Sequence, residues 1–419
     1  MSAIPLAHQP TGGIEHSPAV AFLRPVLGIG GSERLVLDAA IQLQRRGCRV
    51  RLFVPGRLEP PQFPEVGDGA VAVEQVPTAL PVHIHGRLRA ALAIGRTMAA
   101  ARALARDPVR HDLILCDVTS HVIPLVKRRT RRPVVFYCHF PDRLLTPEAR
   151  RATLGHRLYR RPIDRMELVG LQAADRVVVN SAFTAAMLRE AFPAMRESTL
   201  TIVHPGVSVS GTPPVAPAPA ASDEIMLLSV SRFDPRKGLE LAIETLAVLR
   251  TRLLPSVFDR VRLVIAGGYE ETLPEQTMVL RDLRALAGRL GVAERVVFVL
   301  SPTSEERDRL LARCRAVVYT PRAEHFGIVP LEAMAAGRPV VAVNRSGPTE
   351  TVLHGQTGWL CPPDAHAFAD ALSTLVTRAD VAQRFGAAGR EHVQRHFSLD
   401  AFGQRLWEVV APFLGVRRC

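Results

Sequence analysis

Two glutamates that could bind hydroxyl groups, Glu324 and Glu332, stand on either side of Gly327. The apolar residues 316–320 predict a buried strand before them, and residues 329–336 favour a helix. Because the first amides of a helix lack partners and the helix dipole adds positive charge there, this junction suits an anion. Carboxylates would repel a phosphate, so we expect each to accept hydrogen bonds from hydroxyl groups beside it. The predicted ligand is a diphosphate with hydroxyl groups on both sides, which describes a nucleotide sugar. An isolated pair of glutamates is more often a solvated loop residue and a surface helix residue, so the prediction depends on the rest of the chain.

Two cations precede a predicted helix farther back in the chain. Arg232 and Lys237 follow the apolar residues 225–231, which predict a strand, and lie in the loop before the next helical pattern. In a parallel sheet this loop falls at the carboxyl edge, where a diphosphate needs cations to balance its charge. Lys237 is also one of only two lysines in the chain. We therefore expect Arg232 and Lys237 to hold the diphosphate.

A glycine pair and a histidine occupy similar places in the first half of the chain. Gly30 and Gly31 follow the apolar residues 20–23, so their bare amides would lie at the carboxyl end of the first strand. His139 follows the apolar residues 134–138 and reaches the same edge. Glycine turns are common and a lone histidine is as often structural, so neither feature decides a function alone. The Gly-x-Gly-x-x-Gly turn of dinucleotide-binding enzymes is absent, which disfavours an oxidoreductase.

Short apolar runs alternate with amphipathic helical patterns along most of the chain, which predicts parallel sheets with helices on both faces. The runs form two series, 20–23, 50–54, 113–116, 134–138, 177–179 and 200–203, then 225–231, 261–266, 296–300, 317–319, 340–343 and 358–361. The predicted fold class is α/β, with two doubly wound Rossmann-like domains facing a central cleft. We assign residues 1–206 to an N-terminal domain and 207–222, rich in Pro and Ala, to a linker. Residues 223–395 form the C-terminal domain, and the helix within 396–419 packs back across the domain boundary.

The composition indicates a globular protein. The chain has 419 residues, 47% hydrophobic and 22% charged. Its six cysteines show no paired spacing, so we expect neither a disulfide framework nor a zinc site, and a reducing cytoplasm. The N-terminus lacks the pattern of a signal peptide, and no window reaches 18 uninterrupted apolar residues. We expect a cytoplasmic protein that can be peripheral at the cytoplasmic membrane face.

The formal net charge of +13 favours an acidic substrate or an anionic membrane surface. Two basic segments, residues 127–132 and 143–165, could make such a contact, although each also fits a solvated face. Nucleic acid is disfavoured as a partner, because the sequence has no zinc-finger spacing or RNA-recognition signature and only 5% of its residues are aromatic.

Together these motifs resemble the retaining glycosyltransferase family 4, whose members have the GT-B fold. The resemblance runs over nearly the whole chain and rests on Gly30, Gly31 and Glu33, on Arg232 with Lys237 and Gly238, and on the glutamate pair. Residues 136–142, 158–164, 179–184 and 324–332 are similar to the α-1,3/1,6-mannosyltransferases of that family, which extend a lipid-diphosphate-linked chitobiose.

The resemblance implies a role for each motif. Arg232 and Lys237 would hold the donor diphosphate and stabilise it as the leaving group. Glu332 would bind the nucleotide ribose, Glu324 the hydroxyls of the transferred sugar, and His139 would lie beside that sugar. The catalytic group would thus comprise Glu324, His139, Arg232 and Lys237. Backbone amides would line the diphosphate and the sugar at Gly30, Gly31, Phe326, Gly327, Ile328 and Val329.

The resemblance also implies the substrates. The donor would be GDP-mannose, and the acceptor a glycan linked to a lipid diphosphate. No cofactor and no metal are expected, since the family acts without one and the sequence has no Asp-x-Asp motif. We expect retention of configuration, and closure of the cleft around the donor. Two alternatives remain open: a family 4 enzyme that uses a UDP-sugar, and a non-catalytic protein that binds nucleotide sugars.

Overall fold

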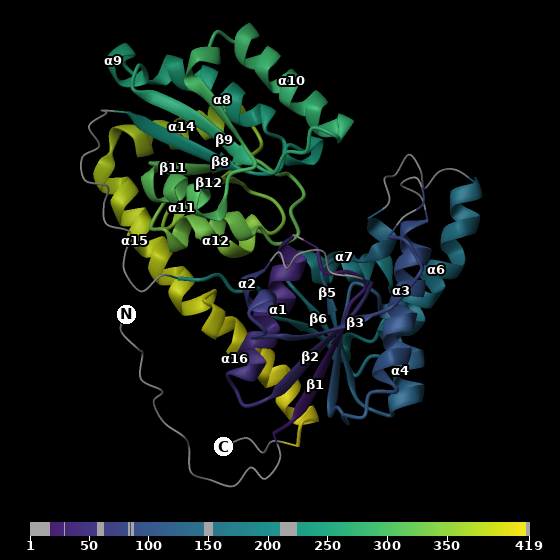
Figure 1. Ribbon diagram of the computed structural model, residues 1–419. Helices are drawn as coiled ribbons and strands as arrows, with labels where there is room; N and C mark the ends of the chain where they lie inside the picture. Colours follow the sequence, from purple (N-terminus) through teal and green to yellow (C-terminus); the bar gives the residue numbers. More distant parts are fainter. Residues whose placement is uncertain are drawn as a thin grey trace, which may run out of the picture.

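The computed structural model describes residues 17–28, 30–56, 63–82, 84, 88–145, 154–209 and 224–415. Within these ranges the chain forms two sheets whose strands are all paired in parallel, each sheet with helices on both faces (Figure 1). This arrangement confirms the predicted pair of doubly wound domains. None of the helices described has the length and apolar character needed to cross a membrane.

The first sheet has the strand order β3-β2-β1-β4-β5-β6-β7. Its strands are β1 Ala19–Leu23, β2 Arg49–Pro55, β3 Ala72–Val76, β4 Leu113–Asp117, β5 Val134–Cys138, β6 Arg176–Val179 and β7 Leu200–Ile202. The helices that accompany it are α1 Gly31–Gln44, α2 Pro64–Gly67, α3 Arg89–Leu104, α4 Ile123–Thr130, α6 Leu154–Ala173 and α7 Ala182–Ala191. The strand order reverses between β1 and β4, and in such sheets ligands bind beyond the carboxyl ends of the strands at that point.

The second sheet has the order β10-β9-β8-β11-β12-β13. Its strands are β8 Ile225–Val230, β9 Val261–Gly267, β10 Val296–Leu300, β11 Ala316–Tyr319, β12 Val340–Val343 and β13 Gly358–Cys361. Its helices are α8 Glu240–Arg252, α9 Pro255–Phe258, α10 Pro274–Arg289, α11 Ser304–Arg313, α12 Ile328–Ala335, α13 Pro348–Thr351, α14 Ala365–Thr377 and α15 Ala379–His396. Here the reversal falls between β8 and β11, and the loops after these two strands carry Arg232, Lys237 and Glu324.

The strands are buried on both faces, which explains why they read as continuous apolar runs. In β1, Ala21 and Leu23 contribute to one core cluster, while Val20 and Phe22 contribute to another on the opposite face. Strand β3 is absent from the sequence prediction. It lies at the edge of its sheet, and most of its side chains are partly or fully exposed, so it lacks the apolar run that marks the other strands.

The C-terminal helix α16, Leu399–Val410, returns to the first domain. Phe402, Leu406 and Val410 are buried in the same cluster as Leu35 and Leu43 of α1. Figure 1 shows α15 and α16 running along the side of both domains. A short parallel bridge joins Val207 to Ser398, and residues 210–222 of the predicted linker lie outside the described residues. The helix therefore ties the two domains together beside the cleft.

Candidate active site

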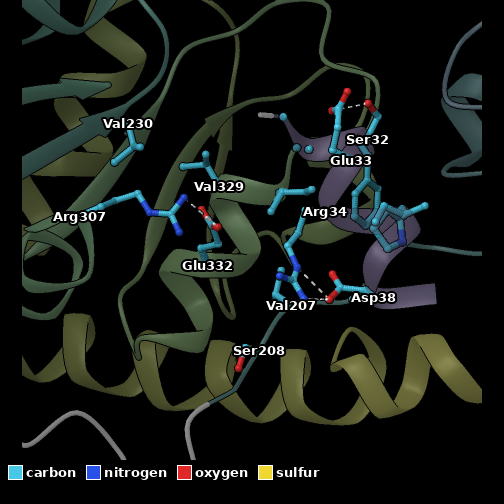
Figure 2. Close-up of a pocket in the computed structure, with 18 of the residues that line it drawn as sticks. Ser32, Glu33, Arg34, Asp38, Val207, Ser208, Val230, Arg307, Val329 and Glu332 are labelled. Carbon is cyan, nitrogen blue, oxygen red and sulfur yellow. Dashed lines mark hydrogen bonds and ion pairs between the residues drawn. The ribbon is translucent and has the colours of Figure 1, made fainter. Parts of the chain in front are cut away.

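A large cavity lies between the two domains, at the carboxyl edges of both sheets (Figure 2). The first domain contributes Gly30, Gly31 and His139 to its lining. The second contributes the remaining predicted site residues, Arg232, Lys237, Glu324, Phe326, Gly327, Ile328, Val329 and Glu332. The structure therefore gathers every predicted site residue around one cavity. The roles assigned to them stay predictions.

Two helix N-termini face each other across this cavity. Helix α1 begins at Gly31 and helix α12 at Ile328. A Cβ atom on Gly31 would lie 3.7 Å from Cδ1 of Ile328, so the two helix starts are in near contact. Gly327, which precedes α12, has φ +83°, a left-handed conformation that favours glycine. Partial positive charge from both helices thus meets in the cavity, as an anionic ligand requires.

Two of the predicted site residues, Lys237 and Glu324, are in direct contact with each other. Nζ of Lys237 lies 2.6 Å from Oε2 of Glu324, and the Tyr319 hydroxyl donates to the same oxygen at 3.0 Å. Burial favours the neutral carboxyl, but the ammonium and the hydroxyl outweigh it and hold the pKa of Glu324 below its ordinary value. The threonine after β11, Thr320, donates from Oγ1 to the Lys237 carbonyl at 2.8 Å and so fixes the loop that carries the lysine.

Arg232 differs from Lys237, because no hydrogen bond or ion pair among the described residues engages its guanidinium. Its loop packs tightly against the end of β9. A Cβ atom on Gly267 would lie 1.9 Å from the Ser231 carbonyl oxygen, so only glycine fits there. Arg232 lines the cavity beside Gly268 and can offer a planar pair of donors to a phosphate.

Glu332 lies inside α12 and faces Arg307 of α11, with Oε1 and Nη1 3.2 Å apart (Figure 2). Burial raises the pKa of the Glu332 carboxyl, and Arg307 opposes that rise. Arg307 is a site residue that the sequence analysis missed. It sits in an ordinary charged helix, without a glycine or a strand end beside it.

On the first domain, Asp117 at the end of β4 orients His139. Oδ2 of the aspartate lies 3.2 Å from Nε2 of the histidine, and Asn180 donates to the His139 carbonyl at 3.1 Å. A histidine held in this way presents a fixed edge of its ring to a ligand.

Several contacts cross the domain boundary next to His325, which lines the cavity. Oγ of Ser181 donates to the His325 carbonyl at 2.6 Å, and the rings of Phe140 and His325 stack with centroids 3.8 Å apart. The Glu350 carboxylate accepts from the amides of Ala182 and Phe183 at 2.7 and 2.9 Å. These are the first amides of α7, so a residue of one domain caps a helix of the other.

Glu350 also contacts His204, whose Nε2 lies 3.1 Å from Oε2 of the glutamate. Burial works against the charged form, but His204 and the two amides outweigh it and lower the pKa of Glu350. The carboxylate is therefore charged in its contact with α7. The sequence analysis did not predict this contact.

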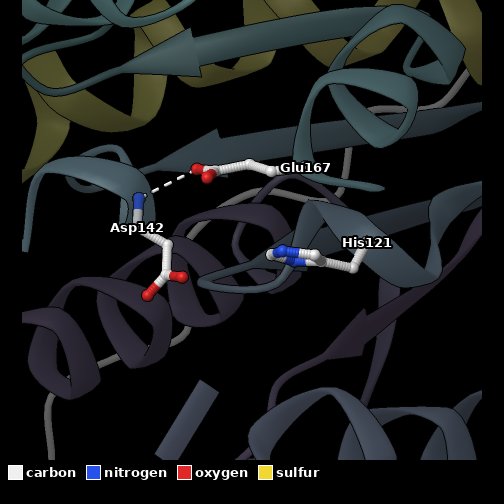
Figure 3. A group of neighbouring side chains, drawn as sticks. All are labelled: His121, Asp142 and Glu167. Carbon is white, nitrogen blue, oxygen red and sulfur yellow. Dashed lines mark hydrogen bonds between the residues drawn. The ribbon is translucent and has the colours of Figure 1, made fainter. Parts of the chain in front are cut away.

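One group of described residues has the geometry to hold a metal ion: His121, Asp142 and Glu167 (Figure 3). Both carboxylates already have partners. Glu167 accepts from the amides of Asp142 and Arg143 at 2.8 and 3.1 Å, and Asp142 accepts from Nη1 of Arg160 at 2.7 Å. These bonds attach α6 to the loop that follows His139, so we interpret the group as one that stabilises that loop and not as a metal site.

Comparison with known proteins agrees with this geometry. The profile described as Glycosyltransferase Family 4 matches residues 29–210, and that of Glycosyl transferases group 1 matches residues 216–392. The chain is 38% identical to the α-1,3/1,6-mannosyltransferase ALG2 of Homo sapiens over 95% of this chain and 96% of that protein. It is 33% identical to the enzyme of the same name from Saccharomyces cerevisiae, over 93% of this chain and 84% of that one.

Solved structures show the same fold. Sucrose-phosphate synthase from Thermosynechococcus elongatus superposes with a TM-score of 0.76 at 23% identity, covering 95% of this chain and 99% of that one. Anabaena Alr3699/HepE in complex with UDP superposes with a TM-score of 0.72 at 20% identity, covering 94% and 100%. The two domains with their central cavity thus form the GT-B architecture of glycosyltransferases.

Proposed function

The chain belongs to the α-1,3/1,6-mannosyltransferases of glycosyltransferase family 4, and we propose that it moves mannose from GDP-mannose to a lipid-diphosphate-linked glycan. One observation carries the proposal for the donor. The N-termini of α1 and α12 meet in the cavity beside Arg232 and Lys237. Two helix dipoles and two cations at one place match a diphosphate, and the carboxylates of Glu324 and Glu332 lie on either side of it.

The proposed reaction exchanges one bond for another at the anomeric carbon of mannose. The bond to the diphosphate oxygen breaks, and a bond to a hydroxyl oxygen of the acceptor forms. The hydroxyl proton passes to the departing diphosphate oxygen, which lies on the same face of the sugar, so the configuration is retained. Negative charge grows on the diphosphate as it leaves. Arg232, Lys237 and the amides of residues 326–329 are fixed where that charge develops.

Glu324 and His139 would orient the sugar from opposite domains. The Tyr319 hydroxyl and the Lys237 ammonium both contact one oxygen of Glu324, Oε2. The other oxygen, Oε1, then remains to accept hydrogen bonds from sugar hydroxyls. We propose that these groups suffice for transfer without a metal or a cofactor.

For the acceptor side, an exposed face of α6 supports contact with an anionic membrane. Leu158, Met166 and Val169 are exposed on this helix, and Arg161 and Arg165 are exposed beside them. The acidic residues Asp164 and Glu167 instead contact groups within the domain. Apolar side chains among arginines, without an exposed carboxylate between them, fit a surface that carries acidic lipids. Such a surface would hold the protein at the cytoplasmic face, where a lipid-linked acceptor is accessible.

Calorimetric titration with GDP and with UDP tests the donor proposal. We expect tighter binding of GDP, and loss of binding in Arg232→Ala, because no described residue forms a hydrogen bond or ion pair with its guanidinium. Glu332→Ala should weaken binding of GDP but not of inorganic diphosphate, since only GDP carries a ribose. Preference for UDP would reject the GDP assignment, and equal binding in all variants would reject this cavity as the donor site.

A further inference from the structure

Arg24 is a buried cation whose role the reaction above does not include. It follows β1 directly, and only 1% of its side chain is exposed. Its guanidinium faces two carboxylates. Nη2 lies 3.2 Å from Oε1 of Glu33, and Nη1 lies 3.6 Å from Oδ2 of Asp117. A charge so far from water persists only with partners of this kind.

The two carboxylates belong to different parts of the candidate site. Glu33 lies in the first turn of α1, two residues after the glycine pair, and Arg24 also donates to the Ser32 carbonyl at 3.3 Å. Asp117 is the residue that contacts His139, and it uses the same oxygen, Oδ2, for both contacts. Arg24 therefore connects the start of α1 to the histidine of the cavity.

The topology explains why these residues meet. Strands β1, β4 and β5 are neighbours in the sheet, and Arg24, Asp117 and His139 stand at their carboxyl ends. Three groups at adjacent strand ends therefore form a row, and the last of them, His139, lines the cavity. A guanidinium suits the first place in the row, because its planar fork can face two carboxylates at once, which an ammonium cannot do equally well.

We propose that Arg24 is a positioning residue for sugar transfer, which sets the imidazole of His139 and the start of α1 as one unit through Asp117 and Glu33. The inference rests on the proposed function only in that His139 is taken to lie beside the transferred sugar. Arg24 itself touches no substrate. Its effect is on the orientation of the ring and on the place of the glycine amides.

The expected consequence is a separation of binding from turnover. Arg232 and the α12 amides, which belong to the second domain, stay intact when Arg24 is replaced. Among the groups proposed to hold the diphosphate, only the α1 amides depend on Arg24, so binding of nucleoside diphosphate should weaken by no more than about fivefold. Turnover should fall by about tenfold to a hundredfold, since a small displacement of a group beside the reacting sugar has an effect of that size.

The experiment compares Arg24→Met, Arg24→Lys and Asp117→Asn with a matched control elsewhere in the same domain. Arg51, Asp107 and His111 repeat the trio at the opposite edge of the sheet, with Nη1 of Arg51 and Nε2 of His111 3.1 and 3.0 Å from Oδ2 of Asp107. Arg51→Met thus removes an arginine from an Arg–Asp–His trio that lies away from the cavity. Asp117→Asn keeps the size of its side chain, so it provides a second route if Arg24→Met fails to fold.

Two quantities are measured for each variant. The first is the pair kcat and KM, with whichever nucleotide sugar the wild type uses. The second is the tautomer of His139, from the nitrogen signals of ring-labelled histidine, with the signal assigned by its loss in His139→Gln. In the wild type, the contact with Asp117 favours the tautomer that carries hydrogen on Nε2.

We expect Arg24→Met and Asp117→Asn to lower kcat and to change the His139 tautomer population, and Arg24→Lys to recover part of both. Arg51→Met should lower the melting temperature but leave kcat and the His139 signal unchanged. The proposal is overturned if kcat falls no further in Arg24→Met than in Arg51→Met, or if kcat falls with the His139 tautomer unchanged. Absence of sugar transfer by the wild type would instead contradict the proposed function, and the tautomer comparison would still decide the link from Arg24 to His139.

Discussion

Lys237 and Glu324 form an ion pair on the wall of the cavity, with Nζ and Oε2 2.6 Å apart. Both residues are predicted to bind the donor, the lysine through the diphosphate and the glutamate through the sugar. Their contact places a cation and a hydroxyl acceptor side by side, as the proposed binding of a nucleotide sugar requires. In that proposal, a donor phosphate replaces part of the contact between the lysine and the carboxylate.

Substitutions of Lys237 and of Glu324 should have different effects on the binding of GDP. Lys237→Ala removes a cation from the diphosphate and should weaken GDP binding. Glu324→Gln releases the lysine for the diphosphate, so GDP binding should be unchanged or tighter, while kcat falls by about a hundredfold. Titration calorimetry and steady-state kinetics measure the two effects. Lys127→Ala is the control, since this other lysine pairs with Asp175 at 2.8 Å outside the cavity. Equal weakening of GDP binding by both site variants would contradict the assignment.

Much of the candidate site follows from local features of the sequence. Gly30, Gly31 and Glu324 each stand between an apolar run and a helical pattern, and Glu332 lies in the helix that follows Glu324. Parallel sheets place such junctions at one edge. Arg307 and the contact of Glu350 with α7 could not be found in this way. The first depends on how α11 packs beside α12 within one domain, and the second on how the two domains approach one another. The link from Arg24 to Asp117 likewise depends on the strand order. Strand β3 was not predicted, because a strand at the edge of a sheet need not be apolar on both faces.

The buried carboxyl of Glu167 predicts a pH dependence of stability. Burial raises its pKa from 4.5 to about 7, against the lowering effect of its two amide partners. The unfolded chain therefore loses this proton at lower pH than the folded one. The stabilising effect of the bound proton is complete below about pH 4.5 and is lost as the pH rises to about 7, a change of roughly 3 kcal/mol.

Chemical denaturation of the wild type and of Glu167→Gln at several pH values checks this. Glutamine cannot ionise, so the variant should gain stability relative to the wild type as the pH rises through that window. Curves that stay parallel from about pH 4.5 to 7.5 would show that Glu167 does not titrate there.

The contact of Glu350 with α7 is expected to hold the two domains together. Glu350→Ala leaves the first amides of α7 without their charged acceptor, and each such hydrogen bond contributes about 1.5–3 kcal/mol. We expect faster hydrogen exchange at Ala182 and Phe183, a larger radius of gyration in solution, and kcat/KM lower by about tenfold. Glu391→Ala, which removes an exposed glutamate on α15, is the control. Unchanged exchange at both amides would argue against the contact in solution.

The exposed face of α6 predicts binding to acidic lipid vesicles. Sedimentation with vesicles should carry the wild type down at low salt and release it as salt screens the arginines. Leu158→Ser should weaken vesicle binding by about tenfold, because the variant has no leucine side chain to transfer from water into the membrane. Leu254→Ser is a close match in the other domain, since Leu254 is 71% exposed and Leu158 69%. Equal weakening by both substitutions, or no vesicle binding at low salt, would show that this face of α6 does not bind the membrane.

Sugar transfer itself tests the central claim most directly. GDP-mannose, UDP-glucose and UDP-N-acetylglucosamine are each offered with and without a synthetic mannosyl-chitobiosyl-diphosphate lipid, and the products are identified by mass and anomeric configuration. We expect transfer from GDP-mannose alone, only when the lipid is present, and with an α-linked product. Lys237→Ala should lose most of this transfer activity. Transfer from a UDP-sugar alone, or transfer that Lys237→Ala leaves intact, would contradict it.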